Sequence, residues 1–164
     1  MANPANLTYV TLTGLQFQEL VTQDPEAEPA HLKGLASPKL KYYMPRSSLI
    51  RSPDQRVLLM CLSSENPGHY LKHDGYRHFP VGIVELEVSP YQEDVMWLKY
   101  ITVHPQYQRQ GIAKQLLAMV VEYMQKNPRI LHRSAPSEEG ALKIQGYISE
   151  LLNEAGVRWS QTGD

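Results

Sequence analysis

Residues 97–125 constrain the fold more than any other stretch, because an apolar strand pattern leads through a polar turn directly into a long amphipathic helix pattern. Residues 97–103 are rich in aromatic and β-branched side chains, which favours a strand, and Pro105 ends it. Apolar side chains then recur every three or four positions, which predicts a helix; they are Ile112, Leu116, Met119, Val120, Tyr123 and Met124. We therefore expect the chemistry of the chain at this junction.

The start of the predicted helix is unusual. No Ser, Thr, Asp or Asn stands where a cap is expected, and Arg109 and Lys114 flank the first turn without an acid. A helix N-terminus carries a partial positive charge and N–H groups without partners. Added cations, together with a glycine at Gly111, therefore favour an anionic ligand such as a phosphate. The alternative is an ordinary helix start capped by water, with Arg109 in solvent.

Residues 103–113 resemble motif A of the GNAT superfamily of N-acetyltransferases, whose signature Gln/Arg-x-x-Gly-x-Gly/Ala is matched by Gln108, Gly111 and Ala113. The resemblance implies that backbone amides of the turn hold the pyrophosphate of acetyl-CoA and that the preceding strand contacts its pantetheine arm. The implied cofactor-binding residues are Ile101, Thr102, Val103, Gln108, Arg109, Gln110, Gly111, Ile112, Ala113 and Lys114. The implied fold is α/β, a mixed, twisted sheet of about six strands flanked by helices.

Length and composition fit a single domain over residues 1–164, with a core at about residues 7–159. The chain has 42% hydrophobic and 20% charged residues, which is ordinary globular composition. A formal net charge of -1 gives no overall attraction to nucleic acid or to an anionic membrane. No stretch approaches a membrane span and no signal pattern opens the chain, so a cytoplasmic protein is expected.

Around the motif A unit, periodicity and turn residues predict further elements. Helices are expected at residues 15–22 and 137–155, and strands at 7–12, 56–63, 81–89, 129–134 and 157–160. The strand at 129–134 should run parallel to the motif A strand and splay from it where motif A ends. Cys61 is expected as a buried, inert thiol. A polar loop is expected at 64–80. In the family, the region after the first helix flanks the acceptor cleft, and here it contains Tyr42, Tyr43 and Arg46.

Two glutamates are the candidates for a general base. Alternation places Val81, Ile83, Glu85 and Glu87 on one face of their strand, and a partly buried carboxylate could take a proton from an ammonium. Glu87 is the first candidate and Glu85 the second; the alternative is two exposed edge glutamates. Some GNAT enzymes carry their base on the motif A strand, where this chain has Trp97.

Tyr147 is the candidate general acid. The predicted helix at 137–155 resembles motif B of the family, in which a tyrosine protonates the departing thiolate. Here Gln145 stands at the family's spacing and Tyr147 is the nearest tyrosine, so a packed core tyrosine is the alternative. No metal site is expected, because His69, His73 and His78 stand in a stretch broken by Pro67 and glycines.

The function predicted from these features is acetyl transfer from acetyl-CoA onto a primary amine of a small molecule or of a protein. A regulator that binds acetyl-CoA with little turnover and acts through a protein partner is one alternative, suggested by Trp97 at the base position. Acetylation of a charged tRNA is another, and it would need a local basic groove built from Arg46, Arg51, Lys72 and Arg77. The acceptor and the oligomeric state, including a homodimer, stay open.

Overall fold

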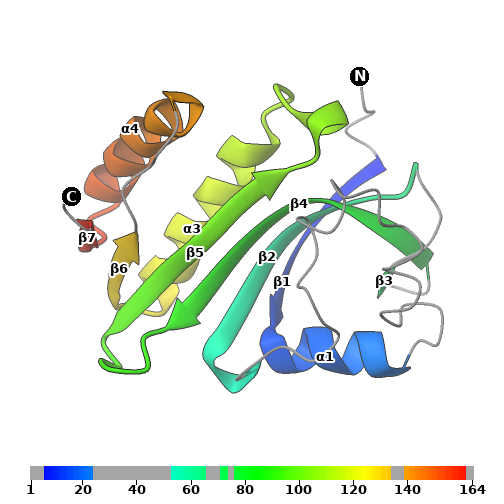
Figure 1. Cartoon of the computed structure of the whole chain (residues 1–164), viewed down its shortest axis with the longest axis horizontal. Helices are drawn as coiled ribbons and strands as arrows, with labels where there is room; N and C mark the ends of the chain where they lie inside the picture. The colour runs from blue at the N-terminus through cyan, green and yellow to red at the C-terminus, as the bar shows by residue number, and fades with distance from the viewer. Residues whose placement is uncertain (1–5, 24–52, 66–70, 74–75, 134–138, 162–164) are drawn as a thin grey trace.

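The structure is a computed structural model that describes residues 6–23, 53–65, 71–73, 76–133 and 139–161. Seven strands form a mixed, twisted sheet in the order β1-β2-β4-β5-β6-β7, with β3 paired to β4 off this path (Figure 1). Their bounds are β1 Leu7–Thr13, β2 Arg56–Ser63, β3 Leu71–His73, β4 Tyr76–Val88, β5 Val95–Val103, β6 Ile130–Arg133 and β7 Trp159–Gln161. The predicted mixed sheet flanked by helices is confirmed.

Pairing is antiparallel from β1 through β5 and parallel from β5 through β7. The parallel pair β5–β6 is joined through a helix, as such a connection requires. One strand exceeds the expected set: within the stretch 64–80, predicted as a polar loop, β3 pairs with the first residues of β4. The loop prediction was wrong for these residues. It relied on their polar composition, whereas they form strands because β3 and β4 pair with each other.

Helices cover both faces of the sheet. They are α1 Gly14–Gln23, α3 Ile112–Lys126 and α4 Glu139–Glu154, with short 3-10 turns at Pro53–Gln55 and Pro105–Tyr107. The helices predicted at 15–22 and 137–155, and the long helix after the motif A strand, are thus present within two residues of their expected ends. Among the helices of the described ranges, none is long and apolar enough to cross a membrane.

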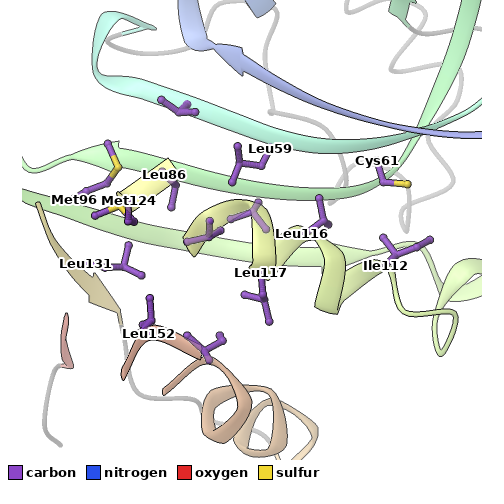
Figure 2. Close-up of a cluster of buried hydrophobic side chains, with 14 of the residues drawn as sticks. Leu59, Cys61, Leu86, Met96, Ile112, Leu116, Leu117, Met124, Leu131 and Leu152 are labelled. Carbon is purple, nitrogen blue, oxygen red and sulfur yellow. The ribbon is translucent and has the colours of Figure 1, made fainter. Parts of the chain in front are cut away.

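The core has two parts because β2 alternates between the two faces of the sheet. Leu59 and Cys61 pack with α3 and α4 in the larger part, which we call the α3-side cluster (Figure 2). Leu58, Met60 and Leu62 face the other way and pack with Phe17 of α1 in the α1-side cluster. Each such side chain contributes about 1.5–3 kcal/mol when fully buried, so both faces of the sheet are anchored.

Two β-bulges change the register on either side of the middle of the sheet. Cys61 pairs with Gly82 but Leu62 pairs with Pro80, so Val81 has no partner on β2. Val81 therefore packs in the α3-side cluster, and its expected place on the face of Ile83 was wrong. Pro80 is tolerated within β4 at this irregularity. In β5 the extra residue is Lys99, because Leu86 pairs with Leu98 and Glu85 with Tyr100.

Candidate active site

The turn between β5 and α3 adopts left-handed backbone at two residues. Arg109 has φ 64° and Gly111 has φ 82°. Gly111 is the N-cap of α3, no side chain caps this helix end, and no acid lies in the first turn. The helix bond from the Gln115 N–H to the Gly111 carbonyl, at 3.0 Å, leaves the N–H groups of the first turn without acceptors inside the helix. The predicted uncapped helix start is confirmed.

Side chains of the turn hold its own backbone. Gln108 donates from Nε2 to the Val103 carbonyl at 3.0 Å, and Gln110 donates from Nε2 to the Gln106 carbonyl at 3.3 Å. These bonds fix the path of the chain from the end of β5 to Gly111. A Cβ built on Gly111 would meet no atom within 4 Å. The glycine is therefore required by its left-handed φ, and the space beside it is open to a ligand.

Among the residues that the structure describes, no strand pairs with one edge of β5 beyond its first half. Its pairing with β6 runs from Val95–Ile130 to Leu98–Arg133, whereas β5 continues to Val103 (Figure 1). Residues 101–103 pair on their other side with β4, and the half-buried side chains of Ile101 and Val103 pack on the α3-side cluster. β6 ends at Arg133 and residues 134–138 lie outside the described residues, so the expected splaying of the two parallel strands stays a prediction. The edge of β5 after Leu98, which no described strand pairs with on this side, is called the free edge, and it leads to the turn at Gly111.

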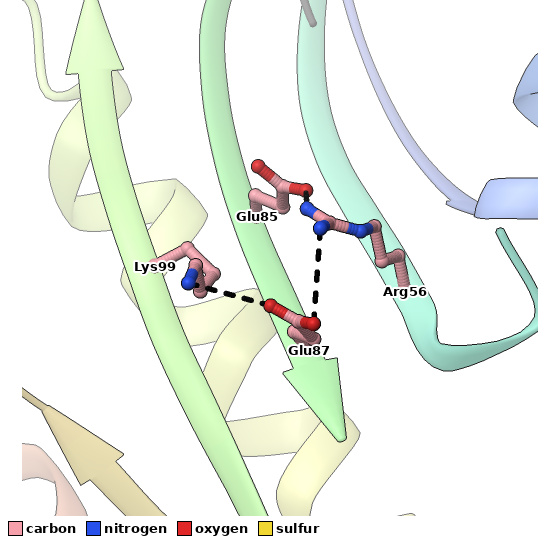
Figure 3. A network of polar contacts seen from close by, with 4 residues as sticks. All are labelled: Arg56, Glu85, Glu87 and Lys99. Carbon is pink, nitrogen blue, oxygen red and sulfur yellow. Dashed lines mark hydrogen bonds and ion pairs between the residues drawn. The ribbon is translucent and has the colours of Figure 1, made fainter. Parts of the chain in front are cut away.

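A charged cluster lies on the opposite face of the sheet, in front of the strands when α3 is behind them (Figure 3). It consists of Arg56 on β2, Glu85 and Glu87 on β4, and Lys99 on β5. Arg56 Nη1 contacts Glu85 Oε1, Arg56 Nη2 lies 3.7 Å from Glu87 Oε1, and Lys99 Nζ lies 3.4 Å from Glu87 Oε2. The two carboxylates are thus bridged by one guanidinium.

The two glutamates share a face as predicted, but neither is an exposed edge residue. Their side chains are 8% and 14% exposed for Glu85 and Glu87, and β4 lies between β2 and β5. Sequence reasoning missed Arg56 and Lys99, their partners. The sequence does show a cation in each of two otherwise apolar strands. Their contact with the glutamates can be inferred only once Arg56 is known to pair opposite Glu87. The roles of Glu87 and Glu85 as bases stay predictions.

Trp97 stands opposite Glu87 in the β4–β5 pairing and lies beside the charged cluster. Lys99 Nζ lies 5.2 Å from the centre of the Trp97 ring, and the exposed Tyr91 ring is tilted against the same indole at 6.3 Å between centroids. A cation near an indole face gains about 0.5–1 kcal/mol at an exposed site. The face therefore combines carboxylates, a primary amine and an aromatic wall.

Tyr147 lies on the α3 side of the sheet, away from the two glutamates. It is half-buried, packs against the α3-side cluster, and has Lys114 Nζ at 5.3 Å from its ring centre. Lys114 belongs to the first turn of α3, so Tyr147 stands next to the turn that carries Gly111. Its role as a general acid stays a prediction.

Other titratable groups near these elements serve the fold. Burial raises the pKa of the Cys61 thiol to about 11, which confirms a buried thiol with little nucleophilic character. Burial lowers the pKa of His104, whose Nδ1 accepts a hydrogen bond from the Gln106 N–H at 3.2 Å. Ser63 and Tyr107 share a buried hydrogen bond at 3.3 Å.

In the part of the chain that the structure describes, no group of three or more His, Cys, Asp or Glu side chains could hold a metal ion. Several predicted acceptor-side and basic residues lie outside the described residues, as does one of the candidate histidines; they are Tyr42, Tyr43, Arg46, Arg51 and His69. The side chains of Lys72, His73 and Arg77 are likewise outside what is described.

Comparison with known proteins identifies relatives by family and by fold. A sequence model of the acetyltransferase (GNAT) family matches residues 38–143. A search of curated proteins finds no significant match to this chain. A similar solved structure is an aminoglycoside acetyltransferase from an uncultured soil metagenomic sample in complex with trehalose, with 15% identity, a TM-score of 0.51 and 88% of each chain covered.

Two further structures resemble the chain more loosely. An aminoglycoside N-acetyltransferase in complex with CoA is 15% identical, with a TM-score of 0.43, over 86% of this chain and 89% of its own. A ribosomal-protein-alanine N-acetyltransferase from Brucella melitensis biovar Abortus 2308 is 17% identical, with a TM-score of 0.45, over 85% and 86%. The family match spans more than half of the sequence and the mixed seven-stranded sheet agrees with it, so this chain belongs to the acetyltransferase (GNAT) family.

Proposed function

We propose that the chain transfers an acetyl group from acetyl-CoA to a primary amine of a small molecule or of a protein. The observation that carries the proposal is the left-handed turn at Gly111, which opens an uncapped helix at the end of the free edge of β5. N–H groups at a helix start bind phosphate oxygens, and a free strand edge offers main-chain groups to an extended chain such as pantetheine. Membership of the acetyltransferase family supports the same assignment.

The chemistry requires positioning more than covalent help. Acetyl-CoA supplies an acyl group that is already activated as a thioester, so a neutral amine held against the carbonyl carbon reacts with little further assistance. Backbone N–H groups at the bulge and free edge of β5 can polarise the carbonyl oxygen. Glu87 can take the ammonium proton, because its contacts with Arg56 and Lys99 are longer than a normal hydrogen bond. Tyr147 can return a proton to the departing thiolate.

Calorimetric titration with acetyl-CoA tests the turn, with Gly111→Asp and Gly111→Asn as a matched pair. Asn and Asp both tolerate left-handed backbone and have almost the same size, and a side chain here meets no atom within 4 Å. The two variants therefore differ in charge alone. One carboxylate about 6 Å from a phosphate charge costs about 3 kcal/mol at an effective dielectric constant of 20, or about 100-fold in affinity.

We expect micromolar binding of acetyl-CoA to the wild type, weakened about 100-fold in Gly111→Asp and only modestly in Gly111→Asn. Pantetheine without its phosphates should bind all three proteins equally and weakly. Equal affinity of the Asp and Asn variants for acetyl-CoA, in folded protein, would show that no phosphate approaches Gly111.

A catalytically weak acetyl-CoA-binding regulator is a second candidate, favoured by Trp97 at the position of the family's base. A screen of amines, peptides and charged tRNA for CoA release separates the two functions. Turnover with any acceptor supports the transferase. Tight acetyl-CoA binding without release of CoA across the panel supports the regulator.

A further inference from the structure

Lys99 occupies a distinctive position on β5. It is the bulged residue of the β4–β5 pair, and it is the first residue after the last pair with β6, Leu98–Arg133. A bulge leaves its extra residue unpaired and redirects its side chain, and bulges are frequent next to active sites. Lys99 thus sits at the point where the free edge of β5 begins, on the sheet face that holds the charged cluster (Figure 3).

The surroundings of Lys99 are those that an amine acceptor requires. Its Nζ lies 3.4 Å from Glu87 Oε2 and 5.2 Å from the centre of the Trp97 ring. The carboxylate can accept a proton from the ammonium, and the indole face stabilises the cation before transfer. The Lys99 side chain is 37% exposed, so a reagent can reach it. The chain therefore carries a primary amine, its proton acceptor and an aromatic wall in one place.

We propose that Lys99 is an internal acceptor, acetylated within the same chain by bound acetyl-CoA. The inference rests on the proposed function, because it requires acetyl-CoA along the free edge of β5. In the transfer, Glu87 takes one proton from the ammonium, and the Nζ lone pair then forms the C–N bond with the thioester carbonyl carbon. The C–S bond breaks, and the second proton goes to the departing CoA thiolate. The products are acetyl-lysine and CoA.

Acetylation changes the charged cluster. The amide that forms on Lys99 has no charge, so Glu87 loses one of its two cationic contacts and keeps Arg56 at 3.7 Å. The Trp97 face loses its cation at the same time. An acetylated Lys99 therefore leaves Glu87 and the indole available to a cation from outside, such as the ammonium of an acceptor in solution.

Mass spectrometry of peptides after incubation with acetyl-CoA tests the proposal, and the chain contains its own control. Lys126 also pairs with a carboxylate, with Nζ 2.8 Å from Glu122 Oε1, and it is more exposed, at 72%. Chemical acetylation without catalysis follows exposure, so it favours Lys126. Transfer inside a site favours Lys99 through proximity, by about tenfold or more. We expect faster modification of Lys99 in the folded protein and equal rates in urea.

Three variants sharpen the result. Gly111→Asp should remove the excess rate at Lys99 and leave Lys126 unchanged, whereas Gly111→Asn should keep most of it. Glu87→Gln should slow Lys99 alone. A first-order rate that does not depend on protein concentration is expected for transfer within one chain. Thermal unfolding of each variant establishes that it is folded.

The proposal is overturned if Lys99 is acetylated no faster than Lys126, or if Lys99 keeps its faster acetylation in Gly111→Asp. It is also overturned if the rate constant for acetylation of Lys99 rises with protein concentration. A parallel titration with acetyl-CoA distinguishes failure of the internal acceptor from failure of the proposed function. Acetyl-CoA binding without modification of Lys99 overturns the internal acceptor alone. Absence of acetyl-CoA binding overturns the proposed function itself.

Discussion

Gly82 determines how closely α3 can approach β4. Its replacement by alanine should therefore lower both the stability of the fold and the affinity of the candidate site for acetyl-CoA. A Cβ on Gly82 would lie 2.9 Å from Ile112 Cγ2 and 3.0 Å from Leu116 Cδ1. Both side chains are at most 1% exposed and lie in the core, where packing is dense, so they can move away from a new methyl group only at a cost. Ile112 is the first residue of α3, directly after Gly111. A shift of the helix therefore moves the N–H groups expected to bind phosphate.

The expected magnitude follows from two opposing effects. Alanine in a strand gains about 0.5–1 kcal/mol over glycine from reduced chain entropy in the unfolded state. Overpacking of a dense core costs about 1–3 kcal/mol. We expect a net loss of about 1–2 kcal/mol for Gly82→Ala, which corresponds to a decrease in Tm of about 2–8 °C for a domain of this size. Acetyl-CoA should also bind more weakly, because the turn moves with the helix.

Gly146→Ala is the matched control. A Cβ on Gly146 meets no atom within 4 Å, and this exposed glycine lies inside α4. The same chemical change should therefore stabilise the chain there by about 0.5–1 kcal/mol through helix propensity. Thermal unfolding and acetyl-CoA titration of both variants give the comparison. A Gly82→Ala protein as stable as wild type, with equal affinity, would show that α3 does not depend on this close contact.

Three further predictions concern titratable groups. Glu87→Gln should leave acetyl-CoA affinity intact and flatten the alkaline rise of the rate, and an unchanged pH–rate profile would assign the base elsewhere. Burial lowers the pKa of His104 below 6.5, so the unfolded state takes up a proton first and stability falls as the pH decreases below about 6.5. Urea unfolding curves at about pH 7 and about pH 5 measure this decrease in stability, and His104→Asn should remove it. A decrease in the variant equal to that in the wild type would exclude His104 as its source. With its pKa raised to about 11, Cys61 should resist iodoacetamide at about pH 8 until urea unfolds the chain, and rapid alkylation of the native protein would contradict its burial.

The elements that local sequence patterns define were predicted well. The apolar spacing from Ile112 to Met124 determines one buried face of a helix, and α3 runs from Ile112 to Lys126. The uncapped start of α3 and the glycine at that start were predicted for the same reason, since both depend only on residues adjacent in the sequence. The parallel pairing of β6 with β5 followed from the single helix between them, because a helical crossover carries the chain back to the end of the sheet where β5 began.

The register of strand pairing across the sheet could not be predicted from the sequence. Val81 and Lys99 are bulged residues whose displacement depends on strands that meet only in the folded chain. A one-residue shift moves a side chain to the other face, which is why Val81 was assigned to the wrong side. The same limit hid Arg56, because its contacts with Glu85 and Glu87 depend on the pairing of β2 with β4.

The charged cluster itself argues for different roles of the two glutamates. Glu85 is the more buried and directly contacts Arg56, so removing Arg56 takes away the cation beside a buried carboxylate and costs about 3–5 kcal/mol of stability. Glu87 is the more exposed and holds its two cations at 3.7 Å and 3.4 Å, distances that bind neither of them firmly. A proton acceptor must exchange partners during each turnover, whereas a structural carboxylate must not. The geometry therefore favours Glu85 as the residue that fixes Arg56 and Glu87 as the residue free to accept a proton from an amine.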